Sequence, residues 1–425
     1  MQYELIKNSI TGDSYKKFHH PAGLDVLVWE MPGFSTTSAL FATKYGSINT
    51  RFKTAADDDF VDVPDGIAHF LEHKLFENED CDVFELYAKT GANANAYTTF
   101  DHTAYLFDCS ENYLESLKIL LDFVQKPYFT QQTVDKEQGI IGQEIKMCED
   151  SPQRRVLFNL LKCLYKKHPV RIDIPGTVES IRKIDAELLY RCYRTFYNLH
   201  NMVLVIAGNC NADEVMAACD EMLIPSKDIG LETAFPEEPK GVLQPSVEEV
   251  MPVGTTLFNI GYKAPAFSGN DLVKMELESS ILLQLIMGSG SPLYKELFDE
   301  GLLNSQFSTE VFYGDGFFSN LVGGESKDPY EVQRRINAEI ERYKAEGFDD
   351  EKFKIVKNSM YGSMIKNFDN VENCANSLIS AYIAGDLSAF APIEALAGVT
   401  AEDLLRDLPL LLDTEQSAIS VIKAQ

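Results

Sequence analysis

The sequence predicts an α+β fold made of two tandem halves with the same order of elements. At 425 residues the chain is too long for one ordinary hydrophobic core, so at least two domains are expected. Each half opens with predicted strands, continues through helices and closes with a strand. Prolines at positions 225, 236, 239 and 245 interrupt the region between the halves. We therefore expect domains at residues 1–222 and 247–425, joined by a linker at 223–246.

The individual elements are predicted from apolar periodicity and from the turn residues that bound each segment. The first half has strands at 24–30 and 36–45, a helix at 66–77, a short helix at 81–89, strands at 95–99 and 103–107, helices at 112–124 and 131–148, and a strand at 201–208. The second half has a strand at 255–264, a helix at 272–287, strands at 305–313 and 317–322, helices at 330–345 and 350–384, and a final strand at 418–423.

The composition excludes several classes of function. A net charge of −27, from 65 acidic and 38 basic residues, repels nucleic acid and favours cationic partners such as basic peptides. No apolar run is long enough for a membrane span, and the N-terminus lacks the layout of a secretion signal. Eight cysteines are scattered without C-x-x-C pairs, so we expect reduced thiols and a cytoplasmic protein.

The helix predicted at 66–77 carries His69, Glu72 and His73 in an H-x-x-E-H pattern. His69 and His73 are one turn apart on one face, where two imidazoles can hold a Zn²⁺ ion. Glu72 lies at the flank of that face, within reach of a water on the metal. The pattern is the inverzincin signature of zinc peptidases. The alternative is an exposed histidine pair beside an acid.

The helix at 131–148 supplies a candidate third ligand. Its mainly apolar stripe, Val134, Glu137, Ile141, Glu144 and Cys148, contains two carboxylates, and a buried carboxylate needs a partner. Zinc bound by Glu144 would be one such partner, and Glu137 could hydrogen-bond to a residue that binds the metal or help to position substrate. The alternative is a pair of surface glutamates bound to lysine or arginine.

Two neighbours compete with Glu144 for the metal. Glu149 lies about 140° around the helix from Glu144, so both cannot face one ion. Cys148 is the weaker competitor, because a cysteine in an apolar stripe usually packs.

The strands at 95–99 and 103–107 form a predicted hairpin around Asp101 and His102. Its first strand, from Asn95 to Thr98, could accept an extended peptide as an added strand. The alternative is an ordinary internal hairpin. His102 could in principle bind metal, but a histidine in a turn is more often solvated.

Together these motifs resemble the pitrilysin/insulinase metallopeptidase family, and within it the short bacterial processing-peptidase-like members of the YmfH-like group. The matching residues are His69-Phe-Leu-Glu72-His73, the glutamates Glu137 and Glu144 seven apart, Asn95-Ala96-Tyr97-Thr98, the segment around His168-Pro169, and the strand at 201–208. The resemblance implies two similar tandem domains, each a mainly antiparallel sheet covered by helices.

The resemblance also implies roles for the site residues. One Zn²⁺ per chain would be bound by His69, His73 and Glu144, and Glu72 and Glu137 would serve catalysis. The substrate backbone would pair with Asn95, Ala96, Tyr97 and Thr98. The second half lacks H-x-x-E-H, so we expect no metal site there.

The second half departs from the family pattern at two positions. Peptide-hydrolysing members have a substrate-binding arginine and tyrosine where this sequence has Phe298 and Asn304, unless the segment is misaligned. The expected function is a zinc endopeptidase subunit that cleaves unfolded or basic peptides in a closed chamber. A paralogous partner in a heterodimer, or a second copy in a homodimer, would complete it. The alternatives are a non-catalytic peptide-binding or scaffold subunit, or a maturation protease dedicated to one modified peptide.

Overall fold

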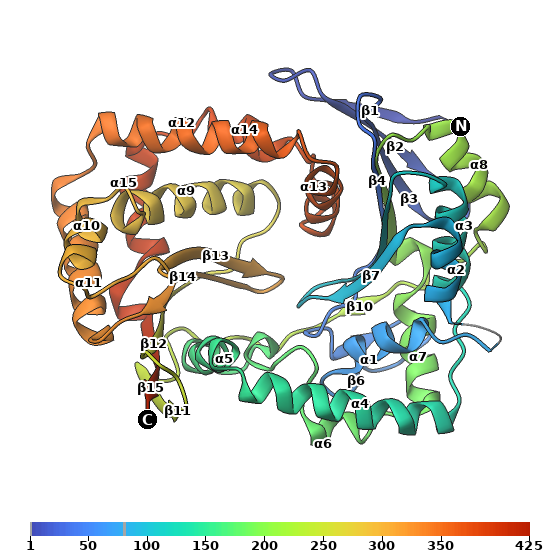
Figure 1. Cartoon of the computed structure of the whole chain (residues 1–425), viewed down its shortest axis with the longest axis horizontal. Coiled ribbons are helices and arrows are strands. Elements are labelled where there is room, and N and C mark those ends of the chain that lie inside the picture. Colours follow the sequence, from blue (N-terminus) through green and yellow to red (C-terminus); the bar gives the residue numbers. More distant parts are fainter. Residues whose placement is uncertain (1, 80–81) are drawn as a thin grey trace. The chain divides into compact units, whose positions relative to one another are not determined.

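The computed structural model describes residues 2–79 and 82–425 and divides into two compact units (Figure 1). The first unit comprises Met1–Ile145, Asp173–Phe235 and Ile365–Phe390, and the second comprises Lys146–Ile172, Pro236–Met364 and Ala391–Gln425. Each unit combines a sheet with covering helices, so the predicted α+β fold is confirmed.

The first unit is built on a seven-stranded sheet in the order β1-β2-β3-β9-β4-β8-β7, with a small sheet β10-β5-β6 beside it. Its strands are β1 Glu4–Lys7, β2 Ser14–His19, β3 Asp25–Glu30, β4 Thr37–Thr43, β5 Arg51–Lys53, β6 Val61–Asp62, β7 Asn93–Thr98, β8 Thr103–Cys109, β9 Met202–Gly208 and β10 Glu232–Thr233. Its helices are α1 Ile67–Leu75, α2 Val83–Thr90, α3 Tyr113–Val124, most of α4 Gln131–Asp150, α6 Val178–Ile181, α7 Ala186–Phe196, α8 Ala212–Met222 and α13 Val371–Ile383. Cys81, at the predicted start of the second helix, lies outside the described residues.

The second unit is built on a five-stranded sheet in the order β11-β15-β12-β14-β13. Its strands are β11 Ser246–Met251, β12 Leu257–Ala264, β13 Ser308–Gly314, β14 Phe317–Glu325 and β15 Ser417–Ala424. Its helices are α5 Pro152–Leu164, α9 Gly269–Met287, α10 Pro292–Asp299, α11 Pro329–Glu346, most of α12 Asp350–Asn367, α14 Ala391–Leu396 and α15 Ala401–Leu411.

The two sheets share one topology. In the first unit the order β3-β9-β4-β8-β7 contains one parallel pair, β3 with β9, and otherwise antiparallel pairs. The second unit repeats it as β11-β15-β12-β14-β13, with β11 parallel to β15. In each of these five-strand sets the strand that comes last along the chain, β9 or β15, lies beside the one that comes first, β3 or β11. The predicted duplication of two similar, mainly antiparallel domains is therefore confirmed.

The two units are not continuous in sequence. Residues Lys146–Ile172, which include α5, belong to the second unit, where α5 packs on β15 and β12. Residues Ile365–Phe390, which include α13, belong to the first unit, where α13 packs on β9 and β4. The domain limits predicted at 1–222 and 247–425 stay a prediction, because each compact unit also contains a segment from the other half of the chain.

The segment Ile365–Phe390 covers one face of the first sheet. Successive strand residues point to opposite faces, so Val26 and Val28 of β3 join the core under the helices while Trp29 points to the other side. There the Trp29 ring lies 5.4 Å from the ring of Phe368 and 5.1 Å from that of Phe390. This aromatic cluster packs the segment Ile365–Phe390 onto the sheet of the first unit.

Replacing Phe390 by alanine is expected to destabilise the first unit by about 3–5 kcal/mol, because the fully buried ring contacts Tyr15, Trp29 and Phe368. Trp29 is the single tryptophan of the chain, so its fluorescence during urea unfolding reports this cluster directly. Phe84→Ala, at a half-exposed ring, is the matched control and should cost about 1 kcal/mol or less. Equal losses for both variants would contradict the assigned role of the segment.

The second unit contains a buried carboxylate that is poorly compensated. Glu278 of α9 is fully buried, and neither of its oxygens accepts a hydrogen bond from the described residues. Lys274 Nζ lies 3.5 Å from Glu278 and 3.8 and 3.9 Å from Asp403 and Asp407 of α15. Burial first, and then the contact with Asp407, raises the pKa of Glu278 to about 7.

Glu278→Gln is therefore expected to make the protein more stable at neutral and alkaline pH. The folded pKa of about 7 exceeds the ordinary value of 4.5, so the folded chain retains a proton that the unfolded chain loses. Wild-type stability should fall between those two values by up to about 3 kcal/mol, and that fall should be missing in the variant. The free energy of unfolding in urea at pH 4.5, 6 and 8 measures this fall, with a substitution at an exposed carboxylate, Glu296→Gln, as control. The same pH dependence of stability in wild type and Glu278→Gln would rule out a role of Glu278 in the fall.

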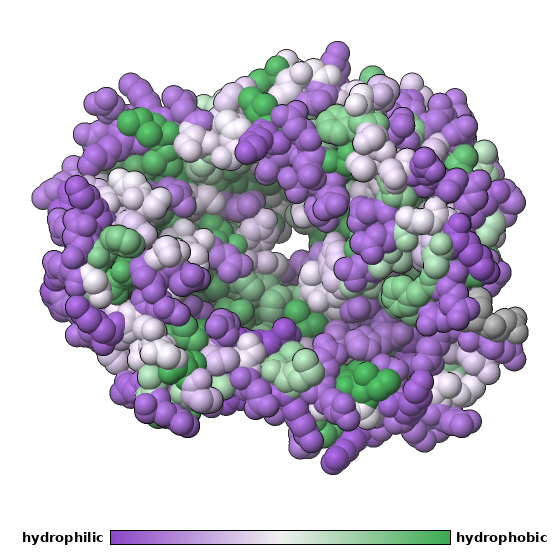
Figure 2. All heavy atoms as spheres, viewed as in Figure 1, coloured by the Kyte–Doolittle hydropathy of each residue, from purple (hydrophilic) through white to green (hydrophobic). Residues whose placement is uncertain are grey.

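The surface is mainly hydrophilic. Figure 2 shows polar residues over most of the visible face of each unit, with hydrophobic residues scattered among them. In the described part of the chain, no helix combines the length and the apolar composition needed to cross a bilayer.

Candidate metal centre and peptide-binding strand

Helix α1 presents the H-x-x-E-H residues because its other side is anchored in the core. Ile67, Phe70 and Leu71 are buried against the sheet, which leaves the histidine side for the site. Gly66 precedes the first helical residue as its N-cap; its φ of 89° suits glycine, and a Cβ atom there would lie 2.3 Å from the carbonyl oxygen of Pro175. The predicted helix is confirmed as Ile67–Leu75, and Gly66 allows the chain to pass close to Pro175 at its start.

His69, His73 and Glu144 converge on one point. His69 Nε2 lies 3.4 Å from Glu144 Oε1, and His73 Nε2 lies 3.5 Å from Glu144 Oε2. One ligand atom from each residue lies within 4.8 Å of the others, and no second group of this kind occurs within residues 2–79 and 82–425. Two imidazole nitrogens and one carboxylate are a donor set that Zn²⁺ binds in catalytic sites, with ligand distances near 2.0–2.2 Å. The residues therefore fit a zinc ion.

Glu137 contacts a histidine of this cluster rather than its centre. The Glu137 side chain is 6% exposed, and its Oε1 lies 2.9 Å from His73 Nδ1. A carboxylate that accepts a hydrogen bond from Nδ1–H orients the ring and leaves Nε2 directed towards the metal position. Burial alone would lower the pKa of His73, but the hydrogen bond to Glu137 and the charges of Glu72 and Glu144 outweigh it and raise the pKa.

The competing ligands named from the sequence lie outside the cluster. Glu149 and Cys148 are on the same helix α4 as Glu144 but do not join the group of converging donors. The imidazole of His69 has its Nδ1 buried without a hydrogen-bond partner among the described residues, so Glu137 orients only one of the two histidines.

Strand β7 forms one edge of the seven-stranded sheet, next to the metal cluster in sequence and in space. It pairs with β8 alone within the described chain and contacts α1. Asn95 is exposed, whereas the side chain of Ala96 packs partly against the core. Thr98 Oγ1 donates a 2.7 Å hydrogen bond to Glu72 Oε2, a contact that the sequence reasoning missed. The even spacing between Ala96 and Thr98 could have indicated it, since both residues point to the helix side of the sheet.

His102 lies in the turn between β7 and β8. Its Nδ1 is 2.6 Å from Asp101 Oδ1 and 2.9 Å from Thr99 Oγ1, and its ring meets Tyr97 edge-on at 5.6 Å. It is not among the converging donors, so its role is to hold the turn.

Phe298 and Asn304 lie in the second unit at and just after α10. Phe298 is 46% exposed, and its ring stacks on that of Tyr294 at 5.8 Å. Asn304 Nδ2 donates a 2.7 Å hydrogen bond to Glu325 of β14. Neither side chain reproduces a guanidinium or a phenol.

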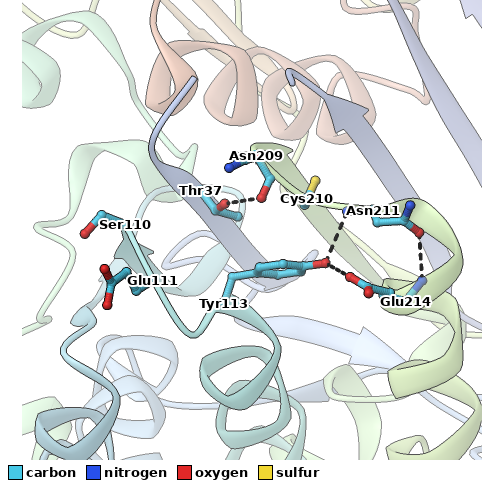
Figure 3. A pocket seen from close by; sticks show the side chains of 8 residues that line it. All are labelled: Thr37, Ser110, Glu111, Tyr113, Asn209, Cys210, Asn211 and Glu214. Atoms are coloured by element: carbon cyan, nitrogen blue, oxygen red, sulfur yellow. Dashed lines mark hydrogen bonds between the residues drawn. The ribbon is translucent and has the colours of Figure 1, made fainter. Parts of the chain in front are cut away.

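The first unit also has a polar cavity of about 370 Å³ (Figure 3). It is lined by Thr37, Ser110, Glu111, Tyr113, Asn209, Cys210, Asn211 and Glu214. Tyr113 stands at its centre, where its hydroxyl donates to Glu214 and accepts a 3.2 Å bond from the Asn211 amide. Thr37 pairs with Cys109, at the far end of β8 from Thr103, so this cavity is separate from the metal cluster.

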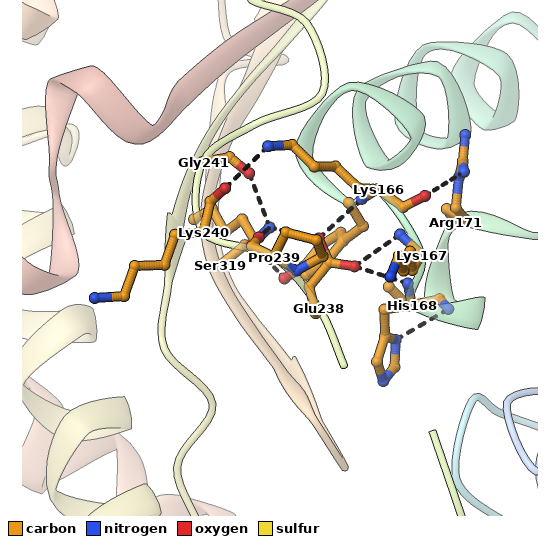
Figure 4. Close-up of polar contacts among 12 residues, drawn as sticks. Lys166, Lys167, His168, Arg171, Glu238, Pro239, Lys240, Gly241 and Ser319 are labelled. Carbon is orange, nitrogen blue, oxygen red and sulfur yellow. Dashed lines mark hydrogen bonds and ion pairs between the residues drawn. The ribbon is translucent and has the colours of Figure 1, made fainter. Parts of the chain in front are cut away.

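The segment around His168, singled out in the sequence, is structural (Figure 4). Glu238 accepts 2.8 Å hydrogen bonds from the amides of Lys166, Lys167 and His168, and Lys263 Nζ donates to it at 2.7 Å. Burial raises the pKa of Glu238, but these hydrogen bonds outweigh it and lower the pKa to about 2. Part of the predicted linker is thereby ordered within the second unit.

Two units of one topology, with a His–His–Glu cluster on the first, define a protein of the two-domain metallopeptidase class. The insulinase family (Peptidase family M16) matches residues 61–178, and the Peptidase M16 inactive domain matches residues 183–360. The chain belongs to the insulinase family of M16 peptidases, which confirms the resemblance seen in the sequence.

Relatives and solved structures agree with this assignment. The uncharacterized zinc protease YmfH of Bacillus subtilis (strain 168) is 40% identical over 95% of this chain and 94% of its own length. The crystal structure of a putative M16-like peptidase from Alicyclobacillus acidocaldarius superposes with a TM-score of 0.94 at 34% identity, covering 100% of this chain and 99% of that one. Pitrilysin, at 16% identity and a TM-score of 0.76, shares the fold, and this chain spans 46% of its length.

Proposed function

We propose that this chain is a zinc-dependent endopeptidase subunit. The observation that carries the proposal is the convergence of His69, His73 and Glu144, with Glu72 on the helix that carries both histidines and the edge strand β7 beside that helix. The names of its relatives as zinc proteases support the choice of metal and of reaction class.

The roles of the residues follow from their chemistry. His69, His73 and Glu144 would hold zinc, which when bound acidifies water and polarises a carbonyl group. Glu72 takes a proton from the attacking water and returns it to the leaving amine nitrogen. Glu137 keeps His73 in the tautomer that presents Nε2. Glu137 is thus proposed to act through His73, rather than on the substrate.

The main chain of β7 would bind the substrate. An extended peptide can add to this edge by backbone hydrogen bonds along Asn95, Ala96, Tyr97 and Thr98, which favours unfolded segments over any one sequence. The net charge of −27 favours basic peptides. These two properties define the proposed substrate class as unfolded, basic peptides.

We further propose that a second subunit completes the site. The chain spans about half the length of pitrilysin, and Phe298 and Asn304 cannot bind a peptide carbonyl as arginine and tyrosine would. A paralogous chain could supply those groups in a heterodimer. The same two residues favour the second candidate function, a non-catalytic peptide-binding subunit.

Hydrolysis of a quenched basic peptide by the zinc-loaded chain, alone and with a paralogous chain from the same genome, tests both candidates. An acidic peptide of the same length is the control. Cleavage of the basic peptide in either condition supports the endopeptidase, and cleavage only with the paralogue supports the split site. Tight peptide binding without cleavage in both conditions would favour the non-catalytic subunit.

A further inference from the structure

The carboxylate of Glu72 is held by one side chain from the edge strand. Thr98 Oγ1 donates to Glu72 Oε2 at 2.7 Å, and Thr98 is its only hydrogen-bond donor within the described residues. A hydrogen bond to a carboxylate is shorter and stronger than one between neutral groups. With Oε2 engaged in this way, Oε1 is the oxygen that remains to take a proton.

The direction of the Thr98 side chain is set by the sheet register. Thr98 pairs with Thr103 of β8, and Ala96 pairs with Tyr105. These residues share the face of the sheet that carries α1, whereas Asn95 and Tyr97 point to the opposite face. Strand β7 can therefore pair its backbone with a peptide at the sheet edge while the Thr98 hydroxyl points to α1.

The end of β7 is fixed by the turn that follows it. The amides of Ser47 and Ile48 donate 3.0 Å hydrogen bonds to the carbonyls of Thr99 and Phe100. Gly46 allows this close approach, since a Cβ atom there would lie 2.3 Å from the Phe100 carbonyl. Thr98 thus reaches Glu72 from an anchored backbone.

Two tyrosine hydroxyls on the core side of Glu72 make no hydrogen bond to its carboxylate within the described residues. The hydroxyls of Tyr105 and Tyr197 are buried and lie 2.8 Å apart, bonded to each other. Burial first, and the nearby charge of Glu72 in addition, raises the pKa of both phenols. Because both phenols stay protonated and are bonded to each other, the hydrogen bond that orients the carboxylate within the described residues is the one from Thr98.

We propose that Thr98 is a positioning residue that links substrate binding to the general base. A peptide that pairs with the β7 backbone fixes the position of the strand. The Thr98 hydroxyl, which that strand carries, then holds the Glu72 carboxylate in its orientation. The proton then moves from water to Glu72 Oε1 and on to the amine nitrogen, while Thr98 keeps its own proton. This inference rests on the proposed function.

A double-mutant cycle in the metal-free full-length chain tests the contact without any catalysis. Thr98→Val and Glu72→Ala are made alone and together, and the urea midpoints are compared. The urea midpoint of the double variant should fall by less than the sum of the falls in the two single variants. Thr37→Val removes the hydroxyl of a buried threonine, bonded to the Asn209 carbonyl at the far end of the sheet, and should add to Glu72→Ala without coupling. Additive shifts for Thr98 would overturn the proposal.

Kinetics then distinguish positioning from simple structural support. Thr98→Val should lower kcat about 10- to 100-fold with little change in KM and with full zinc content. Thr98→Ser, which keeps the hydroxyl, should restore most of kcat. A raised KM at unchanged kcat, a loss of zinc, or no rescue by serine would overturn the positioning role.

The failure of this inference can be separated from that of the proposed function. If the wild-type chain cleaves no peptide with or without a paralogue, the proposed function fails and the base role of Glu72 falls with it. A coupled stability cycle in that case would mark the Thr98–Glu72 contact as structural only, which also overturns the positioning role. If wild type is active and Thr98→Val is equally active, only the inference fails.

Discussion

Replacing Glu72 by glutamine is expected to abolish peptide hydrolysis while zinc stays bound. The amide has the shape of the carboxylate and leaves His69, His73 and Glu144 in place, but it cannot accept a proton from water. The loss in kcat should be about 10²- to 10⁴-fold, the usual contribution of a general base. Zinc content by metal analysis and turnover of a quenched basic peptide measure the two quantities on one sample.

The matched control for this variant is Glu85→Gln. Glu85 is an exposed carboxylate on α2, in the same unit as Glu72, and should keep both zinc and turnover. Loss of zinc together with activity in Glu72→Gln would place Glu72 among the ligands. Unchanged activity would remove it from the reaction.

Replacing Glu144 by glutamine is expected to weaken zinc binding more than any other carboxylate change on α4. Glu144 is the carboxylate that meets both Nε2 atoms, so its replacement removes the one anionic donor of the set. The loss of zinc affinity should exceed the roughly 10- to 100-fold that is typical when a residue hydrogen-bonded to a ligand is replaced. Competition against a chromophoric chelator gives the dissociation constant for each variant.

A graded series makes this test specific. Glu137→Gln should weaken zinc binding by about 10- to 100-fold, because it leaves the ligands but replaces the charged acceptor of the His73 Nδ1–H by a neutral amide. Glu149→Gln, outside the cluster on the same helix, should bind zinc as wild type does. If Glu149→Gln were the weakest binder, the third ligand would be misassigned.

The sequence alone determined the family and the residues around which the site is built. H-x-x-E-H on one helical turn forces two histidines to one side whatever surrounds them, so His69 and His73 could be predicted from local periodicity. Glu144 and Glu137 could be named as candidates because two carboxylates in an apolar stripe require a partner. The repeated order of strands and helices likewise predicted two similar sheets, since topology follows from the order of elements.

Only the tertiary structure decided which atoms meet. Helical periodicity alone leaves the rotation of α4 open, and from the sequence only the family resemblance favoured Glu144 over Glu149. In the structure Glu144 lies at both histidines because α4 presents that face to α1. The contact of Glu137 with His73 and of Thr98 with Glu72 joins residues 64 and 26 positions apart, which no local pattern encodes. The placement of α5 in the second unit and of α13 in the first likewise depends on contacts between residues far apart in the sequence. Side chains far apart in sequence are brought together only when the strands are paired and the helices packed, and that pairing places the proposed base beside the proposed peptide-binding edge.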